Sequence, residues 1–167
     1  MATTNGRLTN FSSFLFDTTN GLQALGTTTN NSATAGNIGE EINAIQSTYT
    51  NYTTSATYQN IVSIALTAGD WDISAFGSIS ANSATLTTSS NAIFNIATAT
   101  ASATGAVEGK SIFYIDENFL GSSIQSCSIY PFRVSLSGST TYYLNTQATF
   151  TVGNPQFVGS IRARRIR

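Results

Sequence analysis

The residues whose type and spacing come nearest to a catalytic arrangement are Asp70 and Asp72, which flank the only tryptophan. Side chains two residues apart in a β-strand point to the same face, so both carboxylates would lie on one surface. Paired carboxylates carry out glycoside hydrolysis, and carboxylate oxygens also bind calcium. The alternative, which we favour, is that Asp70 caps a turn and Asp72 is solvated. A second pair, Asp116 and Glu117, lies in a predicted loop and has the same interpretation.

The rest of the chain lacks the side chains that other enzyme classes use. There is no histidine, which removes the commonest general base and metal ligand. A serine or threonine nucleophile needs an activating base, and neither a Ser-x-x-Lys nor a Gly-x-Ser-x-Gly arrangement occurs. Cys127 lies among small alternating residues, a pattern typical of a buried thiol. Because phosphate-binding and zinc-binding spacings are also missing, we expect no catalysis, no cofactor and no metal.

The composition indicates a β-rich protein whose partners are not selected by charge. Only 9% of the 167 residues are charged, against roughly 25% in ordinary globular domains. Serine, threonine and asparagine take their place, which favours self-association or exposed β-structure. A net charge of −1 provides no field that would attract nucleic acid or an anionic membrane. The first residues lack a basic region followed by an apolar one, so we expect no secretory signal. No apolar run approaches the ~20 residues that span a bilayer.

The elements that would position Asp70 and Asp72 are two strands joined by a turn. Apolar and small polar residues alternate before Ala68-Gly69-Asp70 and resume the alternation at Trp71, which predicts a β-hairpin with one buried face. Similar short strands recur every 8–12 residues from residue 36 onward, which predicts an all-β antiparallel sandwich. The predicted core residues are Val62, Ile64, Leu66, Trp71, Ile73, Leu144 and Phe150.

The first 35 residues differ from the rest, so we divide the chain into residues 1–35 and 36–167. Asn20-Gly21 is a strong turn signal for a small hairpin, but the aromatic residues before it also fit helical spacing. A polar stretch from residue 27 predicts a linker. This apolar segment either anchors the chain to a partner or packs on its own domain. The candidate anchor residues are Phe11, Phe14, Leu15, Phe16, Leu22 and Leu25.

Arginines crowd the last residues of the chain. In a strand, Arg162 and Arg164 share one face and Arg165 lies on the other. We favour ion pairing across a subunit interface over nucleic-acid binding, because arginine suits bidentate carboxylate pairs and the rest of the chain offers no basic surface. The carboxylates considered as partners are those of Glu40, Glu41, Asp70 and Asp72, and the residues expected at the interface or in ion pairs are Glu40, Asp72, Arg162, Arg164 and Arg165.

Four segments together resemble a known family. AGNIGEEI (35–42), SIALTAGDWDIS (63–74), YYLNTQATFTVG (142–153) and GSIRARRIR (159–167) are similar to the small C-terminal knob domain of bacteriophage tail-fibre and other virion-surface proteins. The resemblance implies a jelly-roll-like sandwich, similar to tumour-necrosis-factor and C1q head domains, that forms a homotrimer on the outside of a virion.

The short N-terminal part departs from tail-fibre proteins, which carry a long shaft. It suits a capsid decoration (cement) protein or short head fibre that docks on the major capsid protein or another virion protein. The alternative is a receptor-binding knob that recognises a host surface glycan or protein, with Tyr49, Tyr52 and Tyr58 stacking on sugars. A third class is a polysaccharide depolymerase that uses Asp70 and Asp72.

Overall fold

The structure is a computed structural model that describes residues 14–17, 21–24, 32–82, 85–86, 91–102, 106–114 and 123–167. The chain divides into two compact units, Met1–Asn31 and Ser32–Arg167. The second unit therefore begins four residues before the expected boundary at residue 36. Within the described ranges every helix or strand element is a β-strand, and none of these ranges holds a helix that could cross a membrane.

The N-terminal unit contains an antiparallel pair, β1 (Phe14–Asp17) and β2 (Gly21–Ala24). Phe14 lies opposite Ala24 and Asp17 opposite Gly21, so of the two alternatives left open by the sequence the strand pair is the one adopted. Gly21 belongs to β2 instead of a two-residue turn. Four candidate anchor residues lie in this pair, Phe14, Leu15, Phe16 and Leu22, while Phe11 and Leu25 fall outside the described residues.

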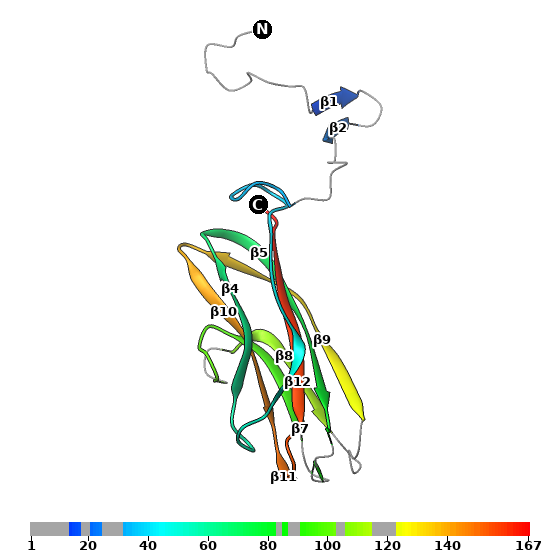
Figure 1. Ribbon diagram of the computed structural model, residues 1–167. Helices are drawn as coiled ribbons and strands as arrows, with labels where there is room; N and C mark the ends of the chain where they lie inside the picture. Colours follow the sequence, from blue (N-terminus) through cyan, green and yellow to red (C-terminus); the bar gives the residue numbers. More distant parts are fainter. Residues whose placement is uncertain are drawn as a thin grey trace. The chain divides into compact units, whose positions relative to one another are not determined.

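The second unit contains two four-stranded antiparallel sheets (Figure 1). The all-β class agrees with the prediction, but the two strands joined at Ala68-Gly69-Asp70 lie in different sheets, so the predicted β-hairpin is wrong. One sheet has the order β4 (Gln59–Leu66), β10 (Thr140–Ala148), β7 (Asn91–Ala97) and β8 (Ala106–Tyr114). The other has the order β3 (Glu41–Asn51), β12 (Gln156–Arg165), β5 (Gly69–Ser80) and β9 (Ile124–Leu136). A short pair, β6 (Thr85–Leu86) and β11 (Phe150–Val152), accompanies them.

The core lies between the two sheets. Trp71, Ile73 and Leu144 are completely buried, and Ile64 and Leu66 are nearly so. Alternation along each strand explains this, because every second side chain of β5 and β12 turns inward. Val62 and Phe150 were also expected in the core but are only partly buried, packing against its margin.

Bulges account for the departures from simple alternation. Leu144 lies opposite Val62 but Asn145 lies opposite Asn60, so Ile61 is an extra residue in β4 and is buried. In the other sheet, Ile73 faces Phe132 and Ala75 faces Ile129, which leaves one extra residue in β9 around Pro131. A bulge suits proline, which cannot donate a ladder hydrogen bond.

Two glycines allow the sheets to approach closely. Gly77 of β5 lies directly opposite Gly159 of β12, and a Cβ atom at Gly77 would overlap the ring of the completely buried Phe94. At Gly159 a Cβ would lie 2.8 Å from the Phe76 carbonyl oxygen and 2.9 Å from a Leu144 methyl group. Because glycine has no side chain, Phe94 and Leu144 of the facing sheet can pack directly against the backbone at these two positions.

We expect Gly77→Ala to destabilise the fold by about 1–3 kcal/mol, because the added methyl group must displace the Phe94 ring in a close-packed core. The measurement is urea unfolding followed by tryptophan fluorescence. Gly138→Ala is the matched control, since a Cβ there meets no atom within 4 Å. Equal unfolding midpoints for the two variants would contradict this account of the glycine pair.

Candidate functional site: the outer face of the β3-β12-β5-β9 sheet

Asp70, the first candidate catalytic residue, has a carboxylate that accepts hydrogen bonds from three side chains of the same chain. Arg167 and Ser135 donate hydrogen bonds to its carboxylate, and Arg133 Nη2 lies 2.9 Å from Oδ2. These donors, Arg167 foremost, hold the pKa of Asp70 well below its ordinary value of 3.8. A carboxylate stabilised so strongly in its charged form is a poor proton donor or acceptor near neutral pH. Asp70 therefore has a structural role.

Asp72 has different surroundings from Asp70. It is half-buried and lies opposite Arg164 on β12 and Arg133 on β9, yet Arg133 reaches diagonally to Asp70. Asp116 and Glu117 fall outside the described residues. In the ranges that the structure covers, no three His, Cys, Asp or Glu side chains gather as a metal site would require. The geometry thus weakens the depolymerase hypothesis.

The terminal arginines form ion pairs with carboxylates of the same chain, whereas the sequence analysis favoured pairs across a subunit interface. Arg162 pairs with Glu41, and Arg165 Nε lies 2.9 Å from Glu40 Oε2. Arg167 pairs with Asp70. The strand order explains these pairs, because β12 lies between β3 and β5 and so brings the end of the chain beside Glu40 and Glu41 on one side and Asp70 on the other. Arg164, also expected in an ion pair, is exposed on the same surface.

The surface of this sheet turned away from the core, here called the outer face, exposes apolar side chains. One cross-strand row joins Ile45, Ser160, Phe76 and Ser128, one residue from each strand. Ile45 is 67% exposed and Phe76 42% exposed. At the β9 bulge nearby, Tyr130 is 86% exposed. Alternation forces this exposure, because the inward positions beside Phe76 already belong to the core residue Ala75 and to Gly77.

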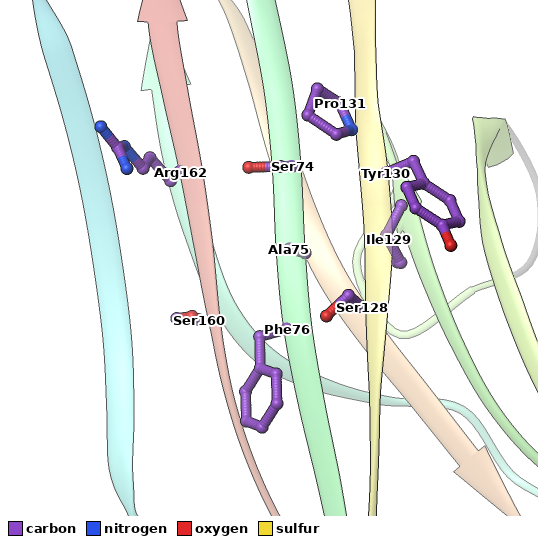
Figure 2. A pocket seen from close by; sticks show the side chains of 9 residues that line it. All are labelled: Ser74, Ala75, Phe76, Ser128, Ile129, Tyr130, Pro131, Ser160 and Arg162. Atoms are coloured by element: carbon purple, nitrogen blue, oxygen red, sulfur yellow. The ribbon is translucent and has the colours of Figure 1, made fainter.

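A shallow depression of about 320 Å³ lies between these side chains (Figure 2). Phe76 and Pro131 project at opposite ends of it, and Ser74, Ser128 and Ser160 line its floor with hydroxyl groups. Tyr130 projects beside β9 at the margin, and Arg162 borders the opposite side. Small residues therefore form the floor of the depression and large residues form its rim. A side chain or ring that projects from a binding partner can fit between them.

Charged residues occupy one end of the outer face and largely neutralise one another. Glu41, Arg164, Asp72 and Arg133 form a second cross-strand row, and the ion pairs of Glu41 with Arg162 and of Asp70 with Arg133 lie in the same region. Since most of these charges already have a partner, the face presents no strong field of either sign. A neutral, partly apolar partner fits it better than a charged polymer.

Tyr49, Tyr52 and Tyr58, which were expected to be exposed and to stack on sugars, are buried or half-buried. Tyr52 is buried; its hydroxyl hydrogen-bonds Thr146 Oγ1 at 2.5 Å, and its ring packs edge-on against Phe157. Burial raises the pKa of Tyr52. Tyr49 and Tyr58 are half-buried. Sequence reasoning missed Tyr130, although the adjacent Pro131 inside a predicted strand is a signal for an irregularity that can project a side chain.

The comparisons with known proteins add no family assignment: no family model matches the chain, and no curated protein matches it either. The case for a function therefore depends on the geometry of the outer face, the composition, and the motifs described above.

We expect acid to remove the stability that Asp70 provides. The pKa of Asp70 is lowered in the folded chain, so its contribution is complete above the unfolded pKa and is lost as the pH falls through the lower, folded pKa. Wild-type unfolding midpoints in urea should therefore fall between about pH 5 and about pH 2. Asp70→Asn should show a lower midpoint at neutral pH and a flatter profile. Asp72→Asn is the control, and an equally flat profile for it would refute the assignment.

Proposed function

We propose that this chain is a non-enzymatic structural protein on the outside of a phage virion. In this proposal it self-associates as a homotrimer through the outer face and docks through its N-terminal unit, as a capsid decoration (cement) protein or short head fibre. Its partners are other copies of itself and a virion protein such as the major capsid protein. The observation that carries the proposal is the exposed apolar centre of a sheet face whose neighbouring charges are paired within the chain.

The size of the apolar centre supports self-association. Aromatic side chains bury roughly 150–250 Å² each, so the exposed parts of Ile45, Phe76 and Tyr130 together present on the order of 300–400 Å². The largest apolar patches on monomers are about 300–600 Å² and are often functional. A stable interface buries about 800 Å² per partner. The patch thus supplies the apolar centre of an interface, and the surrounding Ser, Thr and Asn side chains supply a polar rim.

The trimeric state and the jelly-roll classification are supported by the resemblance of the sequence motifs to phage knob domains. Two antiparallel sheets with a core between them are compatible with that classification. The apolar face supports association between copies without fixing their number. Docking through residues 11–25 is supported by the apolar character of that segment and by its separation into a unit of its own.

A receptor-binding knob is the second candidate, and Tyr130 is the observation that favours it. An aromatic ring that is 86% exposed beside a hydroxyl-lined depression can stack on a sugar while the serines bind its hydroxyl groups. In this alternative a host surface glycan occupies the outer face, with Tyr130 in the role first expected for Tyr49, Tyr52 and Tyr58.

We expect Phe76→Ser to shift the protein toward monomers, because it removes the apolar centre of the proposed interface without touching the core. Sedimentation velocity over a range of concentrations measures the association state, and circular dichroism checks the fold. Val152→Ser is the matched control, since Val152 is 64% exposed but lies on β11. A wild-type protein that stays monomeric at all concentrations would reject the self-association proposal.

We expect deletion of residues 1–31 to leave the β-sandwich folded but to abolish binding to phage particles, because the anchor segment lies in that unit. Co-sedimentation of purified protein with particles that lack it provides the measurement, and electron microscopy locates the bound copies. A truncated protein that still binds particles would remove the anchor from the proposal. Binding to host cells and not to particles would favour the receptor-binding candidate.

A further inference from the structure

The segment Ser32–Glu40, here called the strap, connects the N-terminal unit to β3 and lies against the end of the sandwich. Its backbone turns at Gly36 and Gly39, which have φ values of +86° and +89° that favour glycine. The Gly39 N–H donates to the Arg165 carbonyl oxygen at 2.9 Å, and the Arg165 N–H donates to the Glu40 carbonyl oxygen at 2.8 Å. The strap therefore continues the pairing of β3 with β12 beyond the first residue of β3.

The strap buries very little of itself. Residues 34–38 are exposed, and Ile38, its largest apolar side chain, is 71% exposed. Glu40 is the exception, because only 7% of it is exposed. Hydrophobic contacts thus contribute little to docking. The strap is held by polar contacts: those of Glu40, the Gly39 N–H bond to β12, and the Ser32 hydroxyl oxygen, which accepts the Glu41 N–H at 2.7 Å.

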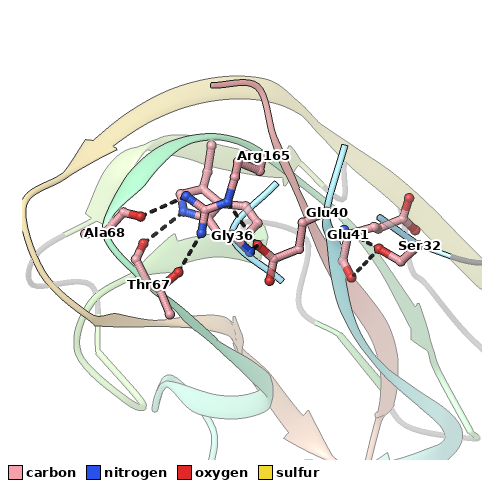
Figure 3. A network of polar contacts seen from close by, with 8 residues as sticks. Ser32, Gly36, Glu40, Glu41, Thr67, Ala68 and Arg165 are labelled. Carbon is pink, nitrogen blue, oxygen red and sulfur yellow. Dashed lines mark hydrogen bonds and ion pairs between the residues drawn. The ribbon is translucent and has the colours of Figure 1, made fainter. Parts of the chain in front are cut away.

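The buried carboxylate of Glu40 binds Arg165 (Figure 3). The strap, β12 and the residues that follow β4 together form this site. The guanidinium Nε donates to Glu40 Oε2 at 2.9 Å, and the terminal nitrogens donate to the Ala68 carbonyl oxygen at 2.8 Å and to Thr67 Oγ1 at 2.6 Å. The guanidinium also lies 4.3 Å from the centre of the Trp71 ring, a favourable cation–π arrangement. All these partners except Glu40 lie between the end of β4 and the start of β5, two strands of different sheets, so Arg165 keeps these contacts whether or not the strap is docked.

Glu40 joins the middle of the strap, at Gly36, to this site. The same oxygen, Oε2, accepts the Gly36 N–H at 2.7 Å and the Arg165 Nε–H at 2.9 Å. Losing the charge on Glu40 would weaken both contacts together and leave the buried guanidinium without its counter-ion. One carboxylate therefore holds the middle of the strap against the end of the sandwich.

We propose that Glu40 and Arg165 form a clamp that holds the strap on the sandwich, and that neutralising Glu40 releases it. Release, together with opening of the exposed hydrogen bond from the Glu41 N–H to Ser32 Oγ, would add the nine residues 32–40 to the connection between the N-terminal unit and β3. At about 3.3–3.6 Å per extended residue, this lengthens the connection by up to roughly 30 Å. The clamp thus controls how far the N-terminal unit can reach, whatever that unit binds.

The surroundings of Glu40 make acid the natural trigger. From β12, Arg165 is the charged side chain in contact with it; the neighbouring Glu41 is directed to Arg162, and Asp70 of β5 is directed to Arg133 and Arg167. The Gly36 N–H, followed by Arg165, holds the pKa of Glu40 below its ordinary value of 4.5. The clamp is therefore closed at neutral pH and opens only when the pH falls through that lowered pKa.

Hydrogen exchange at backbone amides tests the clamp on the full-length chain, with Glu40→Gln as the variant. Exchange at Gly39, whose N–H donates to β12, should become at least about tenfold faster than in wild type, as for a locally opened segment. Amides in the β12–β5 ladder, such as that of Ile161, should keep their protection. Glu41→Gln, which removes the exposed pair with Arg162, is the matched control and should leave Gly39 unchanged.

Unchanged exchange at Gly39 in Glu40→Gln, or equal acceleration in Glu41→Gln, would overturn the proposal. Fluorescence of Trp71 reports whether each variant is folded. If Glu40→Gln fails to fold, Thr67→Val decides the question, because it removes one acceptor of the Arg165 guanidinium while keeping both charges. It should accelerate exchange at Gly39 by a smaller factor, and wild-type exchange in this variant would equally overturn the clamp.

Discussion

The pairing of β12 with β5 is the interaction on which the rest of the structure depends. Ten consecutive cross-strand pairs, from Gln156 with Ser80 to Arg165 with Trp71, join strands that lie far apart in the sequence. This register places Gly159 opposite Gly77 on the inner side, and Ser160 beside Phe76 on the outer face. A shift by one residue would exchange the two surfaces. Core packing and the candidate interaction surface are therefore two consequences of one register.

The two ends of this ladder differ in the physics that stabilises them. Toward Gln156 the inward residues are apolar or glycine, and their packing depends on shape. Toward Arg165 the ladder ends in a buried guanidinium that contacts a tryptophan ring and a buried carboxylate. Removing either member of such a pair is costly because the other charge stays buried. Acid therefore acts on one end of the sandwich, whereas changes of side-chain volume act on the middle.

Local alternation was sufficient to predict the all-β class and the burial of Trp71 and Ile73, because the period of two is a property of each strand alone. It failed at Ile61, where a bulge adds a residue that no single strand reveals. It also failed for the terminal arginines: their partners depend on which strands are neighbours, and strand order is not encoded in spacing. Tyr52 in a Thr/Ser-rich segment looked exposed, but the distant Thr146 satisfies its hydroxyl in the core.

The irregular edges of the β3-β12-β5-β9 sheet limit the ways in which two copies of this chain can associate. Edge strand β9 carries a bulge at Pro131, and edge strand β3 shifts register between its pairs with Phe157 and Gly159. Uninterrupted edges invite strand-by-strand growth into fibrils, and bulges and proline are devices that prevent it. Open-ended polymerisation through backbone pairing is thus disfavoured, while contacts through side chains on the sheet face stay available.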